Sequence, residues 1–100
     1  MPEIPDGYGP DDQIDHEAPD PVYLQLAAVL VARIKRGDYP PRRAVPGVDR
    51  LVQEFGVARG TARKSLVLLA EKGIVRTVVG KGSFVVDQTA GKPTEDSNPS

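Results

Sequence analysis

Four cationic or hydroxyl side chains gather at the start of a predicted helix, and their types suit the recognition of nucleic-acid bases. They are Arg59, Thr61, Arg63 and Lys64. An Arg guanidinium can bind the O6 and N7 atoms of guanine through two hydrogen bonds, and Thr can contact a thymine methyl group. A recognition helix needs its opposite face to be apolar for packing, as it is in this segment. The pattern indicates DNA contact, and a solvated basic face is the alternative.

A second candidate is the sequence Gly80-Lys81-Gly82 between two apolar runs. Glycines allow the backbone to pass close to a phosphate, and Lys81 adds a cation there. The alternative is a hairpin turn with a solvent-facing lysine. A phosphate-binding loop is excluded, because the residue five positions before Gly80 is Val75 rather than glycine.

Further basic residues precede this region. Arg50, with Arg42 and Arg43 upstream, suits phosphate contacts that fix the position of the protein on DNA, or else a solvated surface. The acids near the only histidine, His16, imitate a metal cluster, but they lie in a proline-rich segment that predicts no rigid site. No cysteine and no catalytic set is present, so we expect no metal, no cofactor and no enzyme activity.

The elements that position these residues follow from the spacing of the apolar side chains. Asp20 suits the N-cap of a first helix with Pro21 at its first position, and Gly37 suits its end. We expect further helices over residues 48–55 and 60–72, then β-branched strands over residues 74–79 and 83–86. The predicted fold is mainly α with a small β-hairpin: a winged helix-turn-helix of three helices and a two-stranded wing.

Charge divides the 100 residues into three parts. Residues 1–20 carry a net charge of −7, residues 21–86 carry +8, and residues 87–100 carry −2. We predict a disordered acidic tail, a DNA-binding winged domain and a disordered polar tail, in that order. The acidic tail either solubilises the protein or competes with DNA for the basic surface. The longest apolar run is too short for a bilayer and no signal peptide is visible, so we expect a cytoplasmic protein without membrane contact.

Residues across positions 21–86 resemble the DNA-binding domain of the GntR family of bacterial transcription regulators. The resembling segments are Tyr23-Leu24-Gln25-Leu26, Arg33-Ile34-Lys35-Arg36-Gly37, Val45-Pro46, Phe55-Gly56-Val57-Ala58-Arg59, Thr61-Ala62-Arg63 and Gly80-Lys81-Gly82-Ser83-Phe84-Val85. The resemblance implies a homodimer that binds a palindromic operator and represses transcription. It assigns base or phosphate contacts to Arg59, Thr61 and Arg63, and a wing-tip contact to Gly80 and Lys81.

Three departures from that family concern the same interface. Ala58 stands where a capping Ser or Thr is usual, Gly60 where a Thr is usual, and Asp49 where an Arg is usual. They motivate a second hypothesis, a winged helix that binds a protein partner with weak or no DNA binding. Family members also continue into a larger effector domain, whereas 14 residues follow Val86. We therefore expect no small-molecule effector site within this chain.

Overall fold

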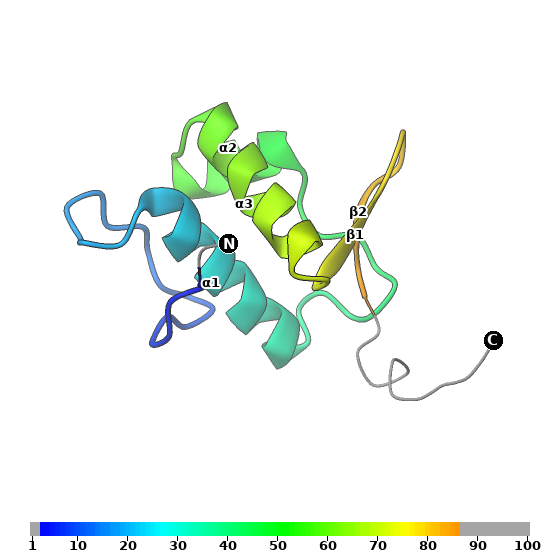
Figure 1. Cartoon of the computed structure of the whole chain (residues 1–100), viewed down its shortest axis with the longest axis horizontal. Helices are drawn as coiled ribbons and strands as arrows, with labels where there is room; N and C mark the ends of the chain where they lie inside the picture. Colours follow the sequence, from blue (N-terminus) through cyan, green and yellow to red (C-terminus); the bar gives the residue numbers. More distant parts are fainter. Residues whose placement is uncertain (1–2, 87–100) are drawn as a thin grey trace.

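The computed structural model describes residues 3–86, which form three helices and one antiparallel hairpin (Figure 1). The elements are α1 (Val22–Arg36), α2 (Val48–Phe55), α3 (Arg59–Glu71), β1 (Val75–Val78) and β2 (Gly82–Val85). Their order and type confirm the predicted winged helix-turn-helix. The predicted tail over residues 87–100 lies outside the described residues.

Helix α1 begins at Val22, one residue later than the sequence predicts. Pro21 is the N-cap and has an extended backbone, so the predicted cap by the Asp20 side chain is wrong. The Asp20 carboxylate instead accepts a hydrogen bond from the Tyr8 hydroxyl at 2.8 Å. At its other end, the helix closes at Gly37, whose φ of 95° is the left-handed conformation that the sequence predicts there.

The core lies where α1 packs along α3, with α2 across one end of the pair (Figure 1). Leu26 and Leu30 of α1 are fully buried, as are Leu51 of α2 and Leu69 of α3. Residues three or four apart on a helix share a face, so the apolar stripes of α1 and α2 both pack against α3. The packing fixes the direction in which α3 presents its remaining side.

The hairpin follows α3 and adds its inner face to this core. Val75 pairs with Val85, and both side chains are buried. The strands are joined by a four-residue turn in which the Lys81 N–H donates to the Val78 carbonyl at 3.0 Å. Gly80 is the third residue of this turn, and its φ of 79° is the positive value that the position requires. The turn projects from the domain as the wing.

A short third segment joins the wing, which the sequence does not predict. The Val45 N–H donates to the Ser83 carbonyl, and the Val85 N–H donates to the Arg43 carbonyl, both at 2.9 Å. Ala44 faces Phe84 as an isolated β-bridge. The segment follows two prolines and shows no alternating apolar pattern, so only its position beside β2 makes it a strand.

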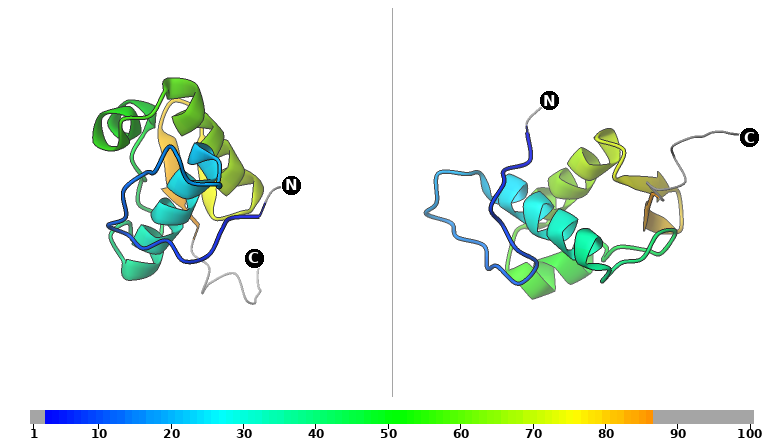
Figure 2. Two further views of the ribbon diagram at one scale, coloured as in Figure 1. Left: turned by 90° about the vertical axis from the view of Figure 1, so that its left-hand side faces the viewer. Right: turned by 90° about the horizontal axis from the view of Figure 1, so that it is seen from below.

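Residues 3–20 lie as irregular chain against α1, which differs from the prediction of a disordered tail (Figure 2). Gln25 is fully buried between the helix and this segment. Its Oε1 accepts from the Asp15 N–H at 2.9 Å, and its Nε2 donates to the Asp15 and Asp20 carbonyls at 2.8 Å each. As a result, α1 is buried on all sides over the six residues from Gln25 to Leu30.

Candidate nucleic-acid interface

Helix α3 presents a basic side to solvent. Arg59, Arg63 and Val67 are exposed, whereas Ala62 and Leu69 are fully buried. Successive residues turn by about 100°, so positions 59, 63 and 67 form a single stripe on the side away from the core. The structure therefore brings two of the predicted contact residues, Arg59 and Arg63, onto the same exposed surface.

The first turn of α3 carries no side-chain cap. Ala58 is the N-cap and makes no side-chain hydrogen bond, as its methyl group predicts, and no acid stands in the first turn. The backbone N–H groups at this end thus remain available to an anion such as a phosphate, which the helix dipole favours. Gly60 is exposed beside them, and a methyl group added to its Cα would meet nothing within 4 Å.

Asp49 forms an ion pair with Arg59, a contact between the first turn of α2 and the start of α3. The two side chains keep 76% and 62% of their exposure, so solvent screens the pair. Asp49 nevertheless holds the Arg59 guanidinium at the edge of the exposed stripe and offsets its charge. The sequence marks Asp49 as an unusual acid but does not reveal this partner.

Thr61 and Lys64 lie on the flank of α3 that meets α1. The Ser65 hydroxyl, one turn after Thr61, donates to the Tyr23 carbonyl at 2.8 Å, and Thr61 is half-buried. The Lys64 ammonium lies 4.2 Å from the centre of the Tyr23 ring, a cation–π contact. These two predicted contact residues are therefore set apart from the stripe of Arg59 and Arg63.

The wing tip carries the other predicted residues. Gly80 and Lys81 are both exposed. Val79 beside them is 97% exposed, which makes it an apolar side chain at the outermost point of the hairpin. Sequence reasoning missed Val79, because a β-branched residue at the end of an apolar run looks like one more buried strand position. Arg50 is exposed on α2, next to Asp49.

Two further cations, Arg33 and Arg36, are paired with acids within the domain. Arg33 contacts Glu54 at 2.7 Å; burial lowers its pKa, but hydrogen bonds with Tyr39 and Glu54 raise the pKa by more. Arg36 lies between Asp38 and Asp11, at 2.5 and 3.0 Å, and hydrogen bonds to both raise its pKa. These two cations stabilise the fold and the N-terminal segment rather than an external contact.

The described residues offer neither a membrane span nor a metal site. No helix within residues 3–86 is long and apolar enough to cross a membrane. The acids around His16 do not come together as a group of three or more metal-ligating side chains in this part of the chain.

Comparison with known proteins gives the family. The model of the bacterial regulatory proteins of the gntR family matches residues 22–85. The transcriptional repressor NagR of Bacillus subtilis is 32% identical over 72 residues, which are 72% of this chain and 30% of that protein. The repressor MngR of Escherichia coli is 37% identical over 68 residues, which are 68% of this chain and 28% of that protein. The chain thus spans under a third of the length of these relatives.

Two solved structures show the same fold. The DNA-binding domain of AraR in complex with operator ORR3 is 34% identical with a TM-score of 0.62, covering 64% of this chain and 77% of that one. YtrA from Sulfolobus acidocaldarius, a GntR-family transcription factor, is 31% identical with a TM-score of 0.63, covering 74% and 77%. Since the family model covers the helices and the wing together, this chain belongs to the GntR family of bacterial regulatory proteins.

Proposed function

We propose that the protein is a sequence-specific DNA-binding transcription regulator that acts as a repressor. The observation that carries the proposal is the exposed stripe of Arg59 and Arg63 beside the uncapped start of α3. Figure 1 shows this end of α3 and the tip of the wing on the same upper side of the molecule. A duplex against that side receives α3 in its major groove and the wing at the minor groove or backbone.

The side-chain chemistry of each predicted contact residue suggests its role on DNA. Arg63 forms no ion pair among the described residues and hydrogen-bonds to the edge of a guanine. Arg59 contacts a second base, which requires its ion pair with Asp49 to break when DNA binds. Lys81 and Gly80 contact the backbone at the wing. Thr61, Lys64 and Arg50, on the flanks, supply phosphate contacts that fix the register.

We propose a homodimer on a palindromic operator in the cytoplasm. The support is indirect: two-fold operators are the usual partners of helix-turn-helix dimers. Relatives are described as repressors, and the AraR domain was solved with operators.

The test is selection of binding sites from random duplexes, followed by titration of the selected duplex with Arg63→Ala. We expect one enriched motif, a loss of about 1–3 kcal/mol in binding free energy, and relaxed preference at one base pair. Lys35→Ala removes the same charge from α1 and serves as the control, with little change. Absence of any motif, or an Arg63→Ala variant that binds like the wild type, would refute the proposal and favour a protein-binding module.

A further inference from the structure

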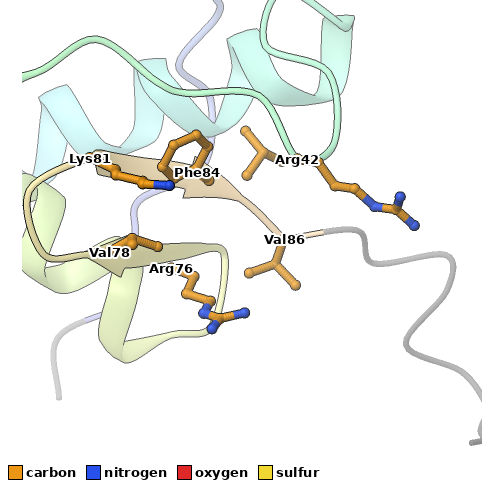
Figure 3. Close-up of a pocket in the computed structure, with 7 residues that line it drawn as sticks. Arg42, Arg76, Val78, Lys81, Phe84 and Val86 are labelled. Atoms are coloured by element: carbon orange, nitrogen blue, oxygen red, sulfur yellow. The ribbon is translucent and has the colours of Figure 1, made fainter. Parts of the chain in front are cut away.

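The outer face of the wing holds a groove of about 460 Å³ that the proposed DNA interface does not explain (Figure 3). It lies on the side of the sheet opposite the core. Seven residues line it: Arg42, Arg76, Val78, Lys81, Phe84, Val85 and Val86. The volume falls within the range of sites that bind small molecules.

The floor of the groove is apolar because of the register of the hairpin. Arg76 pairs with Phe84, and these positions alternate with Val75 and Val85, which point into the core. The side chains of Val78, Phe84 and Val86 are therefore directed outward, and each remains half-buried. A sheet face that met only solvent would be expected to carry polar residues at these positions.

The rim of the groove is cationic. Arg42, Arg76 and Lys81 come from three separate segments and stand at different edges of the apolar floor, with the Arg42 side chain directed away from the other two (Figure 3). Within residues 3–86, no acid lines the groove and no ion pair involves any of these three cations. Three cations without a described counter-charge leave a positive potential over an apolar surface.

Arg42 is held at the rim in a strained backbone conformation. Its φ of 68° makes it the only non-glycine residue with positive φ in the described chain. The Arg42 N–H and the Arg43 carbonyl both bond to Val85, at 2.9 Å each, so two residues face one in a β-bulge whose first position favours glycine. Residues in this conformation concentrate at binding sites, where the surrounding structure maintains the strain.

We propose that this groove binds a small organic anion with an aromatic or branched apolar body. The apolar part covers Val78, Phe84 and Val86, and the acid group lies at the cationic rim. A nucleic-acid backbone fits less well, since sugar and phosphate would leave the apolar floor unmatched. This proposal differs from the sequence-based expectation that the chain has no small-molecule effector site.

Lys81 also belongs to the proposed wing contact with DNA. A bound anion would therefore compete with DNA for this one cation. The competition rests on the proposed function, whereas the binding of the anion does not.

The experiment measures direct binding without DNA, so its failure is separate from that of the proposed function. The probe is 1-anilinonaphthalene-8-sulfonate, an aromatic sulfonate whose fluorescence rises in apolar surroundings. We expect one site per chain with a Kd of about 10–100 µM, the range for a ligand of this size at modest efficiency. N-phenyl-1-naphthylamine, the same ring system without the sulfonate, should bind at least about fivefold more weakly.

Variants locate the site. Arg76→Gln should weaken probe binding about two- to fivefold, as expected for one exposed ion pair, and Arg42→Asn, which tolerates a positive φ, should do the same. Arg43→Gln removes an equal charge from the neighbouring strand position outside the groove and should leave the Kd unchanged. Thermal unfolding of each variant checks the fold.

Several results would overturn the proposal: no saturable binding, equal binding of the neutral ring system, or equal weakening by Arg43→Gln and Arg76→Gln. A probe Kd that rises with protein concentration would indicate that a second copy of the chain covers the groove instead, which also overturns it.

Discussion

Replacing Gln25 by alanine tests whether residues 3–20 are part of the folded domain. Gln25 is fully buried, and its amide makes three hydrogen bonds to the segment, at 2.9, 2.8 and 2.8 Å. Each such bond stabilises a protein by about 1 kcal/mol net. Because the freed Asp15 and Asp20 groups can partly return to water, we expect the free energy of unfolding to fall by about 2–3 kcal/mol.

The measurement is urea denaturation followed by circular dichroism, with hydrogen exchange of the Asp15 amide as a local readout. Gln13→Ala is the control, since Gln13 is exposed in the same segment, and it should change stability by less than about 0.5 kcal/mol. A Gln25→Ala variant within about 0.5 kcal/mol of the wild type, with an equally protected Asp15 amide, would refute the docking of this segment.

The same docking bears on the hypothesis that the acidic tail competes with DNA. The hydrogen bonds from residues 3–20 to the helices are all to α1, through Gln25, Arg33 and Arg36. The segment lies along α1 rather than over the start of α3 (Figure 1). Deleting residues 1–20 should therefore destabilise the domain more than Gln25→Ala does. It should change the DNA affinity of the folded fraction less than about tenfold near 0.15 M salt, where charges separated by more than about 8 Å are screened. A larger rise in affinity would show that the tail covers the interface.

Three further changes test the interface itself. Asp49→Asn removes the ion-pair partner of Arg59 and an acid at the proposed DNA interface. Affinity for all duplexes should therefore rise about two- to fivefold, while discrimination at the base that we propose Arg59 reads should fall. A uniform loss of affinity would contradict this. Lys81→Ala should lower the slope of log Kd against log salt by about one and weaken all duplexes alike, and an unchanged slope would remove Lys81 from the interface. Gly60→Ala should raise the free energy of unfolding by about 0.5–1 kcal/mol, because alanine favours the helix and its methyl group would meet nothing within 4 Å. Thermal or urea denaturation measures this change. A loss of stability would mean that this turn of α3 is not helical.

The helices and the hairpin follow from local signals in the sequence. Leu26, Leu30 and Leu69 recur at helical spacing, and Gly37 supplies the left-handed end of α1. These signals depend only on neighbours along the chain, which is why they predict the elements to within one or two residues.

The third segment of the wing and the docked N-terminal segment depend instead on distant contacts. Residues 42–45 are held by backbone bonds to β2, and their side chains show no strand pattern. Residues 3–20 are polar, but Ile4 and Ile14 pack on the core while Gln25 binds the Asp15 backbone. Composition predicts disorder there because it counts apolar side chains and not the peptide groups that a buried glutamine can bind.

In the candidate nucleic-acid interface, too, some side-chain positions follow from local sequence and others depend on distant contacts. The positions of Arg59 and Arg63 on the exposed side of α3 follow from helical spacing alone. The placement of Lys64 over Tyr23 depends on how closely α1 approaches α3, which no local pattern contains. The pairing of Asp49 with Arg59 likewise depends on the angle between α2 and α3.

The charge of +8 over residues 21–86 overstates what the interface can offer to DNA. Arg33 and Arg36 are paired with Glu54, Asp11 and Asp38. Arg59 is paired with Asp49, which leaves Arg63, Lys64 and Lys81 as the proposed contacts on α3 and the wing that have no ion pair among residues 3–86. A domain that neutralises only about two to four phosphates should show a slope of about −2 to −4 when the logarithm of its association constant is plotted against the logarithm of salt concentration. If the protein acts as we propose, so small a slope for one domain predicts that tight binding of an operator needs two copies on one duplex. A steeper slope for a single domain would show that the internal ion pairs open when DNA binds.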